Sequence, residues 1–172
     1  LLRESGLPDG GQENVVLHLL HGQILGLLNE PERAIEELEV ALEFARLRQD
    51  RRQECEVLMS LCELLDRGGE RSQLLELALQ ARAAAGDVKN SRLLVRSLRQ
   101  IGWEQLRAGR PEEGRAALEE AVQIALDEGN PFMVADAMDS LGAFYYLRGN
   151  YGLAVRGYED LLALLKRSLH PT

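Results

Sequence analysis

The feature that most constrains this chain is a repeat of forty residues. When the sequence is shifted by forty, small side chains fall on one another at Gly22, Cys62, Gly102 and Gly142. A second column, suited to a turn with positive φ, holds Asn29, Gly69, Gly109 and Gly149. Four copies in constant register without an insertion indicate an architecture of stacked structural repeats.

Each copy has the pattern of two helices joined by a short turn. In the third copy, Leu94, Leu98 and Ile101 follow helical spacing. Pro111 then falls at the first position of the next helix, where its missing N–H breaks no hydrogen bond. The pattern predicts eight helices, at about 14–28, 31–48, 51–66, 70–86, 91–108, 111–129, 131–148 and 151–168.

Composition agrees with a helical globular protein and excludes two classes of partner. Of the 172 residues, 45% are hydrophobic, 28% charged and only 5% aromatic, with Leu and Ala dominant, which favours helix over sheet. The net charge of −8 repels phosphate backbones, so we expect no nucleic-acid binding. No apolar run approaches the ~18 residues of a membrane span.

The two cysteines indicate a reducing compartment. Cys55 and Cys62 lie seven residues apart on one predicted helix. That separation is about 10 Å along the helix axis, beyond the ~7 Å between Cα atoms that a disulfide allows. We therefore predict two free, buried thiols and a cytoplasmic protein.

The last copy, "AMDSLGAFYYLRGNYGLAVRGYEDLLAL", resembles the tetratricopeptide repeat (TPR). The matching residues are Leu141, Gly142, Tyr145, Gly149, Ala154 and Tyr158. The second copy is the weakest match, with Cys62 for the glycine and Leu74 for the later small residue. The resemblance implies an all-α, right-handed superhelix of four antiparallel helix pairs, an α-solenoid. The period exceeds the family's usual 34 residues and is similar to long-period variants in bacterial signalling and regulatory proteins.

The predicted TPR-like domain spans residues 14–168. Its repeats lie at approximately 14–50, 51–90, 91–130 and 131–168. Residues 1–13 are expected to form a tail or the end of a preceding element, and residues 169–172 a tail.

Catalytic motifs are absent from the sequence. It has no glycine-rich phosphate loop and no nucleophile on a strand-to-helix turn. His18 and His21 could share a metal, but both fall in apolar core columns and no carboxylate or cysteine completes a ligand set. We expect no enzyme, no cofactor and no metal site, and we interpret acid pairs such as Glu36-Glu37 as solvated helix faces.

One face of the fifth predicted helix stands out chemically. Four arginines and the only tryptophan fall within about 60° of one another, opposite the core residues of that helix. By the family resemblance, this face lines the concave groove of the superhelix. The predicted partner-binding groove comprises Met59, Glu63, Arg92, Arg96, Arg99, Gln100, Trp103, Arg107, Asp136, Asp139, Ser140 and Tyr146.

Two interpretations of this face remain open. In the first, Trp103 anchors a protein or peptide and the arginines bind its carboxylates. In the second, the arginines pair with acids of neighbouring helices and no ligand is involved. The first makes the chain a non-catalytic binding scaffold, the interaction or sensory segment of a larger bacterial regulatory protein.

The end helices suggest an alternative function. The first predicted helix is apolar almost all around, and the last carries four leucines that need cover: Leu161, Leu162, Leu164 and Leu165. Either the native chain continues or these faces meet a second copy. The alternative function is therefore a structural homo-oligomerisation module, with a homodimer as its simplest form.

Overall fold

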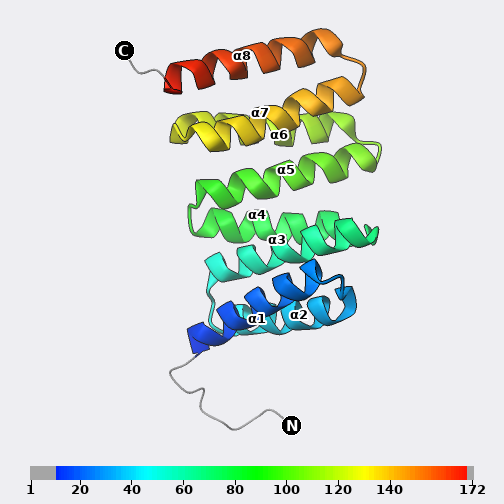
Figure 1. Ribbon diagram of the computed structural model, residues 1–172, viewed down its shortest axis with the longest axis vertical. Helices are drawn as coiled ribbons and strands as arrows, with labels where there is room; N and C mark the ends of the chain where they lie inside the picture. The colour runs from blue at the N-terminus through cyan, green and yellow to red at the C-terminus, as the bar shows by residue number, and fades with distance from the viewer. Residues whose placement is uncertain (1–10, 170–172) are drawn as a thin grey trace. The chain divides into compact units, whose positions relative to one another are not determined.

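The computed structural model describes the backbone of residues 11–169 and the side chains of residues 14–166, and the predicted N- and C-terminal segments beyond them lie outside the described residues. Within that range every element is a helix (Figure 1). The helices are α1 (Gly11–Leu27), α2 (Pro31–Leu47), α3 (Arg51–Gly68), α4 (Leu74–Asp87), α5 (Ser91–Arg107), α6 (Pro111–Glu128), α7 (Pro131–Leu147) and α8 (Tyr151–Leu169).

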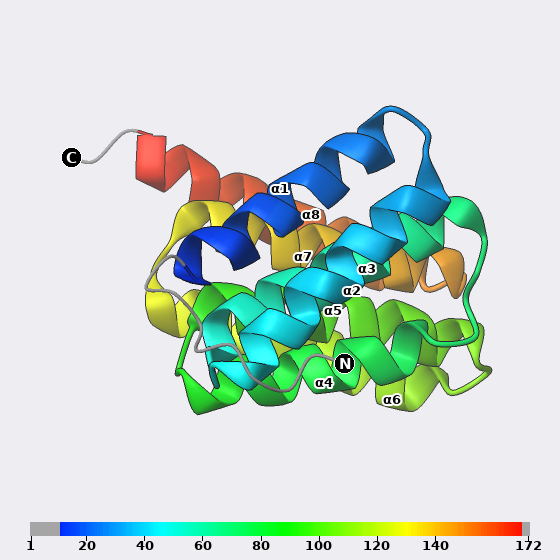
Figure 2. The same ribbon diagram turned by 90° about the horizontal axis from the view of Figure 1, so that it is seen from below.

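The helices form two compact units, one that ends at Val88 and one that begins at Lys89. In the first unit α1 packs on α2 and α3, and α3 packs on α4. In the second, α5 packs on α6 and α7, and α7 packs on α8. Short turns make consecutive helices antiparallel in each unit (Figure 2). The boundary between the units lies two residues before position 90, where the second repeat was predicted to end.

Most helix boundaries fall within three residues of the predicted ones, but α4 was predicted to begin too early. It begins at Leu74 instead of residue 70. Unlike α2 and α6, this segment has no proline to start a helix directly after the preceding turn. The chain makes a further turn instead, in which the Leu74 N–H donates to the Arg71 carbonyl at 3.3 Å. The Arg71 guanidinium pairs with Asp66 at 3.2 Å.

The turns repeat at half the sequence period. Residues with φ between 50° and 78° recur every twenty residues, at Asn29, Gln49, Gly69, Lys89, Gly109, Gly129 and Gly149. The sequence columns predicted the four turns within helix pairs. The structure adds the three turns between pairs, where Gln49 and Lys89 adopt a left-handed conformation that costs a non-glycine residue about 1 kcal/mol.

Two devices for starting a helix recur along the chain. Asp50, Asn90 and Asn130, forty residues apart, cap α3, α5 and α7 by accepting a hydrogen bond from a first-turn N–H. The helices α2 and α6 begin instead with Pro31 and Pro111 and have no side-chain cap. The third pair has one helix of each kind, α5 and α6, whereas α7 combines the cap of Asn130 with Pro131 and α4 has neither device.

The column of small residues brings paired helices together, as predicted. A Cβ atom on Gly102 would lie 2.6 Å from Cγ of Leu118 and 3.1 Å from the Gly114 carbonyl oxygen. Equivalent contacts join Gly22 to Leu38, at 2.8 Å from its Cγ, and Gly142 to Tyr158, at 2.9 Å from its Cζ. A side chain at these positions would force the paired helices apart.

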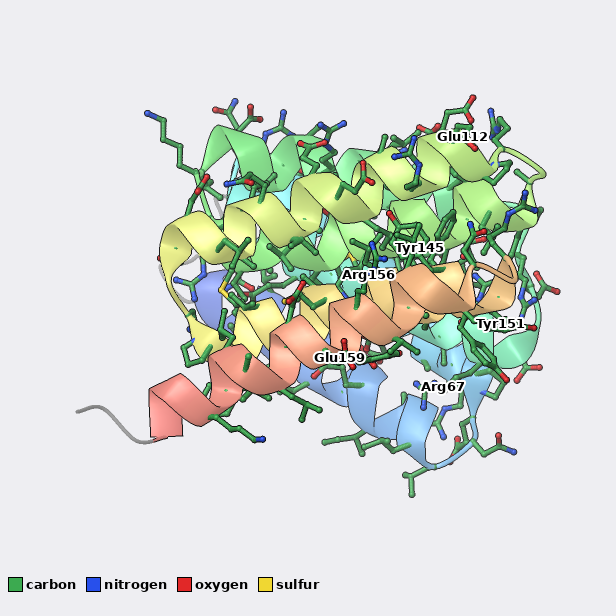
Figure 3. The ribbon with its side chains drawn as sticks, turned by 90° about the horizontal axis from the view of Figure 1, so that it is seen from above. Arg67, Glu112, Tyr145, Tyr151, Arg156 and Glu159 are labelled. Atoms are coloured by element: carbon green, nitrogen blue, oxygen red, sulfur yellow. The ribbon has the colours of Figure 1, made fainter. Side chains whose placement is uncertain are left out.

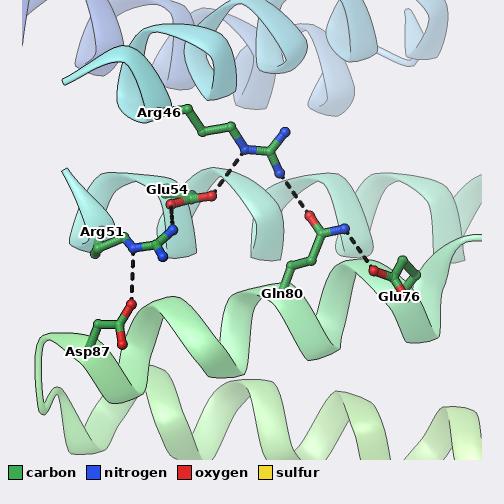
Figure 4. A network of polar contacts seen from close by, with 6 residues as sticks. All are labelled: Arg46, Arg51, Glu54, Glu76, Gln80 and Asp87. Carbon is green, nitrogen blue, oxygen red and sulfur yellow. Dashed lines mark hydrogen bonds and ion pairs between the residues drawn. The ribbon is translucent and has the colours of Figure 1, made fainter. Parts of the chain in front are cut away.

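A buried carboxylate joins three helices of the first unit (Figure 4). Glu54 of α3 accepts from Arg46 Nε of α2 at 3.0 Å and from Arg51 Nη1 at 2.7 Å. Arg46 also donates to Gln80 at 2.8 Å, and Arg51 lies 3.0 Å from Asp87, so both arginines also contact α4. Burial raises the pKa of Glu54, but the hydrogen bonds from Arg51 and Arg46 outweigh it and hold the pKa below its ordinary value of 4.5.

We predict opposite effects of one methyl group at two helical glycines. Gly102→Ala should destabilise the fold by about 1–3 kcal/mol, because its Cβ meets Leu118. Gly157→Ala in α8 is the matched control: no atom lies within 4 Å of its Cβ, so loss of glycine flexibility should stabilise by about 0.5–1 kcal/mol. Thermal unfolding followed by circular dichroism measures both. Shifts of the same sign would contradict the close contact.

The Glu54 network predicts an acid-sensitive contribution to stability. Because the pKa of Glu54 is lower in the folded chain than in the unfolded chain, its stabilisation is complete above about pH 4.5 and is lost as pH falls through the folded value. Glu54→Gln should remove about 1–3 kcal/mol at pH 7 and flatten this part of the stability profile. Denaturant titrations at pH 3 to 7 test this. Glu39→Gln, at an exposed position of α2 outside this network, should change neither, and equal effects of the two variants would refute the assignment.

Candidate binding face on α5 and α7

The residues predicted to form the groove divide between the two units. Met59, which is buried, and Glu63, which is exposed, belong to α3 of the first unit. The other ten lie on two helices of the second unit that pack on each other. We call these ten the α5–α7 face: Arg92, Arg96, Arg99, Gln100, Trp103 and Arg107 of α5, and Asp136, Asp139, Ser140 and Tyr146 of α7.

The α5 side of this face is cationic. Arg92 is exposed and Trp103 is half-buried. The helix has four arginines but only one acid, Glu104, whose carboxylate is buried. Glu104 accepts from Arg107 Nη1 and, at 2.9 Å, from Gln100 Nε2, so it orients both side chains. Glu104 was not among the predicted residues, although its spacing of four from Gln100 and three from Arg107 is a signal for such contacts.

One arginine bridges α5 to α7. Arg99 Nε donates to Ser140 Oγ at 2.7 Å, and Ser140 Oγ donates in turn to the Asp136 backbone carbonyl at 3.0 Å. Arg99 Nη1 lies 3.7 Å from Asp136 Oδ2, and the Asp136 side chain is 69% exposed. The ion pair is therefore long and solvated, and such pairs contribute little to stability. Arg99 therefore has features of both predicted interpretations. Its guanidinium is held in place by α7, but its carboxylate partner, Asp136, is loosely bound.

The other edge of α7 contacts α8. Asp139 Oδ1 accepts from the Tyr158 hydroxyl at 3.3 Å; burial first, and then the Asp139 charge, raise the pKa of that tyrosine. Tyr146 meets Tyr151 edge-on with ring centroids 5.5 Å apart. Figure 3 shows Tyr151 at the start of α8, beside the turn from α7. These α8 partners were not predicted, because Tyr158 was assigned only a packing role.

The two histidines of α1 differ from their prediction. They were expected in the core without a carboxylate, yet both are partly exposed and both contact Glu37 of α2. The distances are 2.6 Å from His18 Nδ1 and 3.2 Å from His21 Nδ1, and the hydrogen bond from His18 lowers the pKa of Glu37. His18 also stacks on Phe44 at 5.8 Å. No group of three or more His, Cys, Asp or Glu side chains among the described residues could hold a metal ion.

A polar cleft of about 520 Å³ lies beside the turn from α2 to α3. It is lined by Arg46, Gln49, Arg51 and Glu54. Both guanidinium groups already pair with Glu54, so the cleft offers little unbalanced charge to a ligand. The two cysteines, as predicted, are free and buried. Within the described chain, no helix combines the length and apolarity that crossing a bilayer requires.

Comparison with known proteins identifies the fold through structure alone. No protein-family model matches the sequence, and no curated protein matches it. Among solved structures, apo RapI is similar with a TM-score of 0.81 at 14% identity, over 93% of this chain and 45% of RapI. A Rap protein complexed with Competence and Sporulation Factor gives a TM-score of 0.77 at 14% identity, over 92% of this chain and 44% of that protein.

The TPR-like repeats of a putative kinesin light chain from Podosopora anserina are also similar. The TM-score is 0.76 at 18% identity, over 96% of this chain and 82% of the other. This chain spans less than half the length of the two Rap proteins named above. It has the fold of TPR-type repeat proteins, an all-α solenoid of four antiparallel helix pairs, as the forty-residue period predicts.

Proposed function

We propose that this chain is a non-catalytic scaffold that binds an acidic segment of a partner protein or peptide on the α5–α7 face. The observation that carries the proposal is the concentration of four arginines beside the single tryptophan on α5, in a protein of net charge −8. An acidic partner is repelled by most of such a surface and attracted to this helix. Guanidinium groups bind carboxylates in a bidentate manner, and tryptophan is a frequent anchor of interfaces.

The geometry of Arg99 supports this proposal. Its guanidinium is oriented by Ser140, so little side-chain freedom is lost when it binds a ligand. A carboxylate of the partner can replace Asp136, whose ion pair at 3.7 Å is long and solvated. Arg92 extends the same cationic face into solvent.

The similar structures support a binding role by analogy. A Rap protein was solved complexed with Competence and Sporulation Factor, so a fold of this type can hold a bound factor. We further propose that the chain acts as the interaction segment of a larger bacterial regulatory protein in the cytoplasm. The Rap proteins, of which this chain spans less than half, show that a fold of this type can lie within a longer chain, and the two buried cysteines, which form no disulfide, support a reducing compartment.

The single tryptophan allows a direct test of binding. We predict that glutamate-rich peptides change Trp103 fluorescence in a saturable, salt-sensitive manner and that lysine-rich peptides of equal length do not. Arg92→Glu combined with Arg99→Glu should weaken the binding at least about tenfold, because each charge-assisted hydrogen bond contributes about 1.5–3 kcal/mol.

Arg156→Glu is the matched control, since Arg156 is an exposed arginine of the same unit on α8 (Figure 3). It changes the net charge by −2, half the change of −4 in the double variant, without touching the α5–α7 face, and we expect unchanged affinity. A loss of binding free energy in the control of at least half that in the double variant would show that only net charge matters. An absence of saturable binding by any acidic peptide would refute the proposed function.

A further inference from the structure

Helix α1 has two apolar faces, of which its own unit covers only one. Val15, Leu19, Gly22 and Leu25 form the inner face and are buried. At 100° per residue, a second apolar face lies opposite. Its side chains are between 38% and 78% exposed: Val16, Leu17, Leu20, Ile24, Leu27 and Leu28. We call these six residues the outer face of α1.

The middle of the equivalent face is covered by helices elsewhere in the chain. Forty residues after Leu20 and Ile24, Ser60 and Leu64 of α3 are buried. The same two register positions in α7 hold Ser140 and Phe144, which are also buried. In α3 and α7 a preceding helix pair of the same unit packs against the helix. The middle of the outer face, at Leu20 and Ile24, therefore has the register of a helix-packing surface, and a helix is the occupant that fits it.

The charge pattern favours a second copy of this chain as that occupant. Residues 14–29 contain no Asp, Glu, Lys or Arg, in a chain with 28% charged residues. Two copies that each carry a net charge of −8 repel one another over most of their surfaces, and the uncharged outer face lets them meet without charge contact. The lack of Lys and Arg also disfavours an anionic membrane surface as the occupant.

The spacing along the helix is self-complementary. Leu17, Leu20, Ile24 and Leu27 alternate steps of three and four residues, as in the seam of a coiled coil. This 3-4-3 spacing is the same in both directions, so an antiparallel copy of α1 places an aliphatic side chain opposite each of these four. Burying the outer face on both copies removes roughly 1,000 Å² of surface, near the ~1,200 Å² at the lower limit of specific interfaces.

We propose that the outer face of α1 is a homodimer interface, in which α1 of one copy packs on α1 of a second copy. The interface is isologous, since the same six side chains serve both partners. It is independent of the α5–α7 face, so the dimer and acidic-peptide binding can fail separately.

Sedimentation velocity on the whole chain at 1 to 100 µM tests the proposal. The wild type should approach twice its chain mass of 19.2 kDa as concentration rises. Leu20→Glu with Ile24→Glu should return it to the monomer mass, with helicity and melting temperature retained because both side chains are exposed. Leu27→Glu, at the most exposed position of the face, is a second variant in case the double one fails to fold.

Leu162→Glu on α8 is the matched control, because Leu162 is an aliphatic side chain of similar exposure, 56%, in the other unit. It should leave the dimer intact. A wild-type monomer at 100 µM would overturn the proposal. So would a dimer that survives folded α1 variants, or one that Leu162→Glu dissociates. Trp103 fluorescence titrations with acidic peptides on the α1 variants separate this failure from failure of the binding function.

Discussion

The close approach of the two helices in each pair is the contact on which the structure depends. In the third pair neither facing position carries a side chain: a Cβ on Gly114 would lie 2.7 Å from the Gly102 carbonyl oxygen, and a Cβ on Gly102 would meet Leu118. The two backbones therefore pack directly against each other, and the side chain of Leu118, one turn after Gly114, packs beside this contact. Because this contact fixes which residues of the two helices lie opposite each other, small and large residues recur in the same columns of the sequence.

The second pair satisfies the same requirement with a different arrangement of volumes. The three contacting positions hold a small, a small and a large residue in the other pairs, for example Gly22, Ala34 and Leu38. In the second pair they hold Cys62, Leu74 and Ala78, all fully buried. The leucine stands one turn earlier along the second helix, at Leu74, and Ala78 stands where the other pairs have the large residue. Each pair thus combines two small residues with one large one, and this shared requirement, rather than residue identity, explains why the copy with the weakest sequence match forms the same helix pair.

The features of the fold that the sequence predicted correctly are local and periodic. Columns at forty-residue spacing identified all eight helices and the close contacts, because packing demands recur at each repeat. The twenty-residue recurrence of left-handed turns was missed, since Gln49 and Lys89 stand where glycine would have marked the conformation. The α8 partners of α7 were missed for another reason: Tyr158 fills a packing column and also donates to Asp139, and a column shows only the first role.

The same columns also separate structural positions from positions open to function. The contact column of Gly22, Cys62, Gly102 and Gly142 varies little because packing restricts it. The column of Trp103 instead holds Gln23, Glu63 and Ala143, which share neither size nor polarity. Packing therefore makes no demand there that only tryptophan could meet. A half-buried indole at an unconstrained position among arginines needs another reason for its presence, and a ligand with an acidic and apolar surface supplies one.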